Sequence, residues 1–82
     1  MKQLKDCSNI LKVYKLDYTV VVVLKKDLDN YDEIFEALAQ QGIDETFDIR
    51  ILTKYILAQD LDNLQSSQVV VNSGELVYEK EN

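Results

Sequence analysis

The stretch Tyr18-Thr19-Val20-Val21-Val22-Val23-Leu24 decides how the rest of this sequence is interpreted. Its four consecutive valines leave the segment without a polar face, and their branched side chains favour extended backbone. A strand that is apolar throughout is covered on both faces, so it lies in the interior of a sheet. The sequence therefore predicts a central strand at 18–24, with the other elements as its neighbours or its cover.

The preceding residues, 10–17, also predict extended backbone, but their alternation of apolar and polar side chains slips near Tyr14-Lys15. Such a slip indicates a bulge, a bend or two separate strands. One long bent strand and a tight hairpin leading into the valines both remain open. In either case we expect Lys12 and Lys15 to face water at a sheet edge, where lysines oppose unwanted strand pairing.

A helix is predicted at about 31–41. Asn30 is a favourable N-cap, and Glu33 three residues later completes a pattern similar to a capping box. Gly42 suits the left-handed position that ends many helices, with Ile43 after it as the apolar contact. The side chains expected to be buried follow helical spacing; they are Tyr31, Ile34, Phe35 and Leu38.

Residues 44–65 allow two interpretations. Residues 46–52 alternate well enough for a strand, whereas a helix at about 45–59 gives two apolar stripes, one on each side. We favour the helix, because Asp44 can cap it and no glycine or proline interrupts it. A helix that is apolar on two sides is buried between layers or shared with a partner. Residues 60–65 then predict a further short turn of helix.

The C-terminal part predicts a β-hairpin. Apolar residues 69–71 and 76–78 flank a turn at 72–75, in which Gly74 suits a left-handed position. The predicted fold is therefore α+β, with a small, mainly antiparallel sheet, two helices packed on one face and a C-terminal hairpin. The 82 residues form one domain, 1–82, of which the polar residues 1–9 are expected to be frayed.

The cysteine content and the hydropathy bear on location. Cys7 is the single cysteine, so the chain has no internal disulfide, which is typical of a reducing compartment. The N-terminal residues lack the apolar core of a signal peptide, and no apolar run approaches the roughly 20 residues of a membrane-spanning helix. These features predict a cytoplasmic protein that does not bind membranes.

Catalytic and metal-binding residues are few. The sequence has no histidine, which is the commonest acid–base group and metal ligand. One cysteine without histidine makes no common zinc site. The acidic residues at 27–33 lack the glycine and the closing glutamate of a calcium loop, and a helix start explains them. We therefore predict no catalytic residues, no cofactor and no metal.

The charge is unevenly distributed over the chain. Residues 1–26 carry six lysines and two aspartates, a net +4, whereas residues 27–82 carry a net −10. An acidic protein is repelled by phosphate backbones, so nucleic acid is an improbable ligand and a basic protein surface is a plausible one. The residues predicted to bind the partner are Asp32, Glu33, Glu36, Asp44, Glu45 and Asp48.

These properties together predict a non-enzymatic, acidic protein-binding module. Small size, acidity and the lack of catalytic residues are typical of accessory proteins of phages and mobile elements. We therefore expect a regulator or inhibitor that binds a basic surface of a host protein. The alternative is a homo-oligomeric structural or assembly protein, because a domain of this size gains little stability from a single core.

Overall fold

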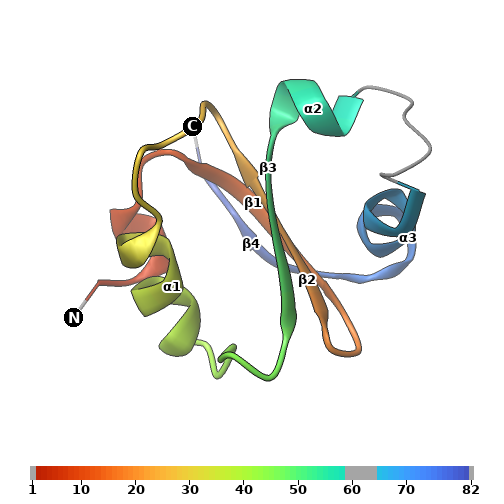
Figure 1. Cartoon of the computed structure of the whole chain (residues 1–82), viewed down its shortest axis with the longest axis horizontal. Coiled ribbons are helices and arrows are strands. Elements are labelled where there is room, and N and C mark those ends of the chain that lie inside the picture. Colours follow the sequence, from red (N-terminus) through yellow and green to blue (C-terminus); the bar gives the residue numbers. More distant parts are fainter. Residues whose placement is uncertain (1, 59–64, 82) are drawn as a thin grey trace.

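The computed structural model describes residues 2–58 and 65–81, and it contains one four-stranded mixed sheet with the order β3-β2-β1-β4 (Figure 1). The strands are β1 (Ile10–Leu16), β2 (Thr19–Leu24), β3 (Asp48–Thr53) and β4 (Glu75–Glu79). The valine strand, β2, lies between β1 and β3, as the sequence predicts. Two of the three pairings are antiparallel, and only β2 and β3 run parallel. The α+β class is confirmed.

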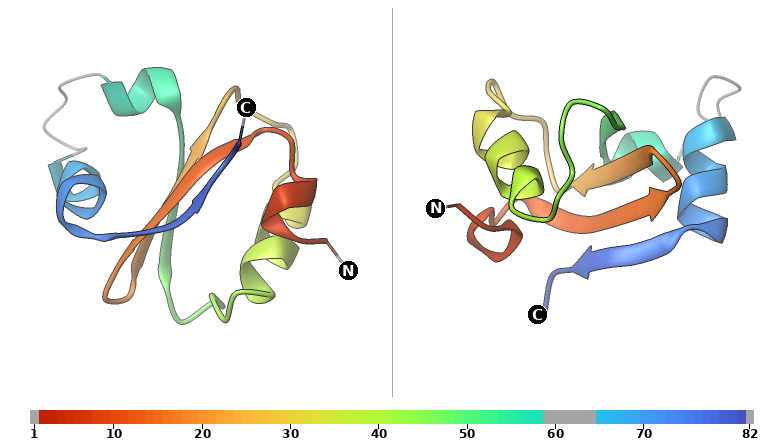
Figure 2. Two further views of the ribbon diagram at one scale, coloured as in Figure 1. Left: turned by 180° about the vertical axis from the view of Figure 1, so that it is seen from behind. Right: turned by 90° about the horizontal axis from the view of Figure 1, so that it is seen from below.

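The two faces of β2 pack into separate hydrophobic clusters, because successive side chains of a strand point in opposite directions. Val20, Val22 and Leu24 belong to one cluster, which includes residues of helix α1 (Asp32–Ala39). Val21 and Val23 belong to the other, with residues of helices α2 (Lys54–Ala58) and α3 (Gln65–Ser73). Figure 2 shows α1 and α3 on opposite sides of the strands. The prediction that both helices cover one face is therefore wrong.

Strands β1 and β2 form the tight hairpin, which was one of the two predicted possibilities. Leu16 lies opposite Thr19, and Asp17 in the turn has a φ of 51°, a left-handed conformation that aspartate tolerates. The irregularity predicted near Tyr14-Lys15 is not in β1 at that position: the register of β1 against β4 shifts between Val13 and Tyr14 because β4 contributes the extra residue, Val77. The extra residue within β1 is Leu11, where the register against β2 shifts.

The lysines of β1 do not lie at a sheet edge, contrary to the prediction. Strand β4 pairs with the outer side of β1, so that Lys12 lies opposite Glu79 and Lys15 opposite Glu75. Opposite charges in cross-strand positions favour this pairing. The acidic C-terminal strand therefore lies next to the basic strand β1 in the sheet.

Helix α1 begins and ends close to the predicted positions. The side chain of Asn30 accepts a hydrogen bond of 2.7 Å from the backbone N–H of Asp32. At the other end, Gly42 has a φ of 79°, and the N–H of Ile43 donates to the carbonyl of Leu38 at 3.1 Å, a Schellman ending. The predicted buried stripe is only partly correct, because Phe35 is 46% exposed.

Residues 48–53 form strand β3, so the predicted helix at 45–59 is wrong except over α2. The parallel pairing with β2 fills the second side of the central strand, and the side chains of β3 join both clusters. The hydroxyl of Thr53 then accepts a hydrogen bond of 3.2 Å from the N–H of Ile56, which caps the start of α2. Of the turn predicted at 60–65, residues 60–64 lie outside the described residues, and Gln65 begins α3.

The predicted C-terminal hairpin is also wrong, since residues 65–73 form α3 and only residues 75–79 form a strand. Val70 of α3 is buried against β2, and the side chain of Gln68 donates a hydrogen bond to the carbonyl of Leu57. These tertiary contacts outweigh the preference of valine for extended backbone. Gly74 is not in a left-handed conformation; its N–H donates to the carbonyl of Val70 at 2.8 Å and ends the helix.

The N-terminal residues take part in the core, although we expected residues 1–9 to be frayed. Residues Leu4–Asp6 form a turn of 3-10 helix, η1, and the side chains of Leu4 and Cys7 are buried in the cluster beneath α1. The backbone N–H of Gln3 donates to the carboxylate of Asp6 at 3.1 Å. Apolar side chains at two positions of an otherwise polar segment are sufficient to hold it against the domain.

Candidate protein-binding surface

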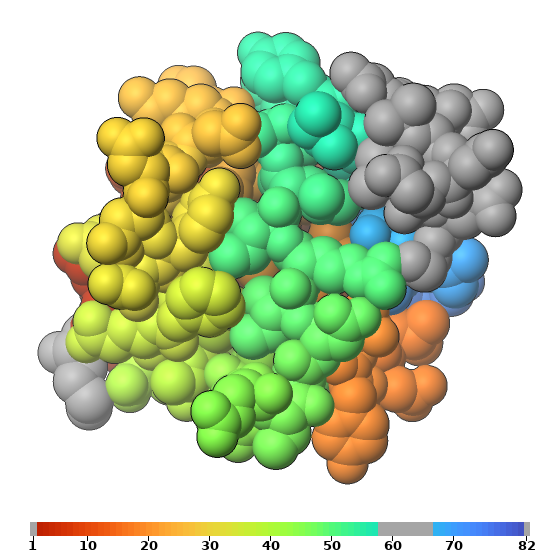
Figure 3. Space-filling model, in the orientation of Figure 1, coloured from red at the N-terminus to blue at the C-terminus, as the bar shows by residue number. Residues whose placement is uncertain are grey.

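The six acidic residues predicted to bind a partner lie on two neighbouring parts of the molecule, and all six are exposed. One part is α1 and the other is the segment that leads from α1 into β3. In the space-filling view these two parts meet on one face (Figure 3). The first part carries Asp32, Glu33 and Glu36, and the second carries Asp44, Glu45 and Asp48.

Basic groups partly neutralise the acidic residues of α1. The ammonium of Lys2 lies 3.6 Å from the carboxylate of Glu33, and the backbone N–H of Lys2 donates to Glu36 at 3.4 Å. At the start of β3, Asp48 lies 3.1 Å from the guanidinium of Arg50. Exposed pairs of this kind contribute little to stability. Within the described residues Glu45 has no ion pair.

Asp44 has a structural role that the sequence did not reveal. Its carboxylate accepts hydrogen bonds from the hydroxyl of Thr46 at 2.6 Å and from the backbone N–H of Thr46 at 2.9 Å. These two bonds, the hydroxyl first, lower the pKa of the Asp44 carboxyl from its usual value, because they stabilise the charged form. Asp44 therefore fixes a turn before β3 while its charge stays exposed to solvent.

A groove lies between α1 and the segment that leads into β3. Its volume is about 590 Å³, and Phe35 of α1 and Phe47 supply its aromatic lining. Asp44 and Glu45 stand at the same groove, so acidic groups border an apolar surface. The remaining lining residues are Ala39, Ile43, Thr46 and Ile49.

Aromatic side chains extend the groove toward the β1–β2 turn. The rings of Tyr18 and Phe47 have centroids 5.3 Å apart, and Tyr18 is 68% exposed. The ammonium of Lys15 lies 5.8 Å from the centroid of the Phe47 ring, within reach of a cation–π interaction. Tyr18 and Phe35, which are exposed, and Phe47, which is half-buried, therefore form an aromatic row on this side of the sheet. We call the groove and this row, with Asp44 and Glu45, the aromatic groove.

Sequence reasoning missed the aromatic groove, since it placed Phe35 in the buried stripe of the predicted helix 31–41 and Phe47 inside the predicted helix 45–59. The two rings come from different elements, which only the fold brings together. The signal that was present is the placement of Phe35 directly before Glu36 on a helix whose other apolar residues already complete a stripe.

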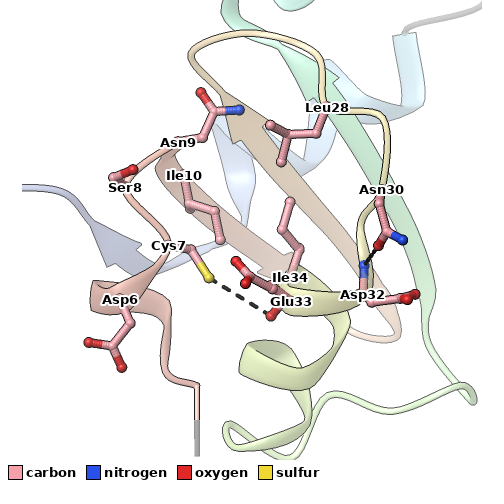
Figure 4. Close-up of a pocket in the computed structure, with 10 residues that line it drawn as sticks. All are labelled: Asp6, Cys7, Ser8, Asn9, Ile10, Leu28, Asn30, Asp32, Glu33 and Ile34. Atoms are coloured by element: carbon pink, nitrogen blue, oxygen red, sulfur yellow. Dashed lines mark hydrogen bonds between the residues drawn. The ribbon is translucent and has the colours of Figure 1, made fainter.

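A second hollow, of about 500 Å³, lies between the N-terminal segment and the start of α1 (Figure 4). Its notable group is the Cys7 thiol, whose sulfur lies 3.8 Å from the carbonyl oxygen of Glu33. Burial first, and then the negative charge of Glu33, raises the pKa of this thiol. The thiol therefore stays protonated at neutral pH and is a poor nucleophile.

Metal ligands do not gather in the part of the chain that the structure describes, where no three carboxylate or thiol groups come close enough to hold an ion. Of the helices within residues 2–58 and 65–81, none has the length and apolar character that a bilayer crossing requires. No known protein family matches the chain, and no similar characterised protein or solved structure was found.

Proposed function

We propose that this chain is a non-enzymatic protein-binding module whose aromatic groove and surrounding acidic residues dock onto a basic surface of a partner protein. The observation that carries the proposal is the groove itself. It combines Phe35, 46% exposed, with Phe47 and with the carboxylates of Asp44 and Glu45. Aromatic side chains at the centre and charged groups at the rim are the arrangement of residues in many protein interfaces.

The charge of this surface supports a basic partner. From Asp32 to Thr53 the sequence contains six acidic residues and a single basic one, Arg50. Complementary charge raises the association rate and suppresses the wrong partners more than it raises affinity. The aromatic side chains would then supply most of the affinity, and the acidic residues most of the selectivity.

The available chemistry supports binding rather than catalysis. The chain has no histidine, and its one thiol is buried with a raised pKa. Small binding modules need neither group. A regulator or inhibitor acting in the cytoplasm agrees with these properties.

The test is quantitative affinity capture from lysate with isotope-labelled mass spectrometry. The bait is compared with a triple variant, Glu36→Gln, Asp44→Asn and Glu45→Gln, in which Asn keeps the side-chain oxygen that accepts from Thr46. Glu36 and Glu45 are exposed, so their replacement should change stability by no more than about 0.5 kcal/mol, and the folding of the triple variant is checked by circular dichroism because Asp44 also holds the turn at Thr46. The control neutralises three acidic positions outside the groove lining, Asp27→Asn, Asp29→Asn and Glu81→Gln, which are also exposed.

We expect basic proteins to be captured by the wild type and the control but to be depleted with the groove variant. Capture should also weaken between low and high salt, since exposed charges are screened over about 10 Å at 0.1 M. Equal capture by all three baits at every salt concentration would contradict the proposal.

A second function, homo-oligomeric assembly, is favoured by one observation, which is the unpaired outer edge of β3. Such an edge can pair with another copy of the chain. Analytical ultracentrifugation over a range of concentrations distinguishes the two functions, because a binding module remains a monomer and an assembly protein does not.

A further inference from the structure

The outer edge of β3 presents backbone groups that no described residue satisfies. The N–H of Asp48 donates to the carbonyl of Tyr18 at 2.7 Å, so Asp48 directs its backbone groups toward β2. Backbone groups alternate sides along a strand, and those of Ile49 and Ile51 therefore point away from the sheet. Within residues 2–58 and 65–81, no group accepts a hydrogen bond from the N–H of Ile49 or Ile51.

This edge is more regular than the opposite edge of the sheet, although it too carries charged residues, Asp48 and Arg50. Strand β4 carries Glu75 and Glu79 at its ends, and its pairing with β1 contains a register shift. Strand β3 pairs with β2 over six residues without a shift. Natural sheets protect edges with charges, bulges or short strands, and a regular edge is a template for a further strand.

The aromatic groove lies beside this edge. Ile49 lines the groove and, with Ile51, packs on the side of the sheet that α1 covers. Figure 3 shows β3 running along the face on which the α1 side and the segment before β3 meet. A strand added to β3 would direct alternate side chains to this same side, toward Phe35 and Phe47.

We propose that β3 accepts an extended, basic segment of the partner as a fifth strand. Apolar side chains of the segment fill the aromatic groove, and lysine or arginine side chains lie beside Asp44 and Glu45. This inference rests on the proposed function and specifies how the partner is held, by strand addition to a sheet edge. A second copy of the chain complements the edge less well, because each copy carries a net charge of −6.

The test uses the full chain, labelled with ¹⁵N, and a short synthetic peptide in which valine and a central phenylalanine alternate with serine, with lysines at both ends to lie beside Asp44 and Glu45. In one control peptide, glutamate replaces lysine. The other carries N-methyl groups on alternate residues, so that one edge of the peptide has no backbone N–H to donate in a hydrogen bond. The first readout is amide hydrogen exchange. We expect the peptide to slow exchange at Ile49 and Ile51, while both control peptides leave these amides unprotected.

The second readout compares Ile51→Pro with Ile51→Ala. Both variants lose the isoleucine side chain, but only proline removes the outward N–H, and an edge strand tolerates proline when that N–H faces solvent. The proline variant should bind the peptide about tenfold more weakly than the alanine variant. Phe35→Ser should weaken binding as well, whereas Val69→Ser, an exposed valine on α3, should not.

Two results would overturn the inference but leave the proposed function standing. In the first, the peptide binds and changes the NMR chemical shifts of Phe35 and Phe47, but hydrogen exchange at the amides of Ile49 and Ile51 is not slowed. The two Ile51 variants then bind the peptide with equal affinity. Alternatively, the peptide could fail to bind while the groove variant still loses basic proteins from lysate. The protein could instead self-associate in a concentration-dependent way that Ile51→Pro abolishes. This result would assign the edge to a second copy of the chain and would contradict both the inference and the proposed function.

Discussion

Replacing Gly74 by alanine tests how α3 joins β4. A Cβ atom at this position would lie 2.5 Å from the carbonyl oxygen of Val70 and 2.6 Å from that of Lys15. Both neighbours are backbone atoms in regular elements, so neither can move without disturbing α3 or β1. The contact explains why glycine occupies this position, although the residue is not in a left-handed conformation.

Two effects of Gly74→Ala have opposite signs. Alanine restricts the unfolded chain, which stabilises a protein by about 0.4–1 kcal/mol where the native conformation suits it. Overpacking a well-filled site costs about 1–3 kcal/mol, and contacts this short with backbone favour the upper end. We therefore expect a net loss of about 2 kcal/mol, which corresponds to a fall of roughly 8–16 °C in Tm for a domain of this size.

The assay is urea unfolding followed by circular dichroism, with Gly42→Ala as the matched control. Gly42 has a φ of 79° and open space around its would-be Cβ, so alanine there costs only the left-handed strain of about 1–2 kcal/mol. Asparagine tolerates that conformation and should recover part of the loss at position 42 but none at position 74. A Gly74→Ala protein as stable as the wild type would refute the packing argument.

Three further predictions concern single side chains. Val22→Asp places an unpaired charge in the fully buried centre of β2 and should abolish cooperative thermal unfolding, since such burial costs several kcal/mol; a folded variant would contradict the interior position of this strand. The pKa of the Asp44 carboxyl is lower in the folded than in the unfolded protein, so the charged carboxylate stabilises the fold. This stabilisation is fully present above the pKa of the unfolded chain and is lost as the pH falls through the pKa of the folded protein. The stability advantage of wild type over Asp44→Asn should therefore decrease below about pH 4 in thermal melts, and a pH-independent difference would disprove the role of this carboxylate. The Cys7 thiol should react with a thiol reagent at pH 8 far more slowly in the native protein than in urea, because it is buried and its pKa is raised; equal rates would mean that the N-terminal segment is open.

The sequence by itself determined the elements whose causes are local. A run of four valines can only be covered on both faces, and this placed β2 in the interior of the sheet. The side chain of Asn30 and the positive φ of Gly42 set the limits of α1 through hydrogen bonds within a few residues. The exposure of the six acidic residues followed equally from their own chemistry, since isolated carboxylates are rarely buried.

Only the tertiary structure decided residues 48–53, whose pattern fits either conformation, and residues 65–73, whose pattern predicted a strand over 69–71. Residues 48–53 form a strand because they pair with the side of β2 that β1 leaves unpaired, and their side chains pack on both faces of the sheet. The spacing of apolar residues within the segment does not reveal this pairing. Residues 65–73 became a helix because Val70 packs against the second face of β2, despite the extended preference of valine. The aromatic groove depended on the first of these outcomes and on the position of α1, since Phe35 and Phe47 line one groove only when β3 and the segment before it lie beside the helix. Contacts between residues far apart in the sequence depend on which segments pair with or pack against β2. The free energy of the whole folded chain decides this, and the pattern of a single segment does not.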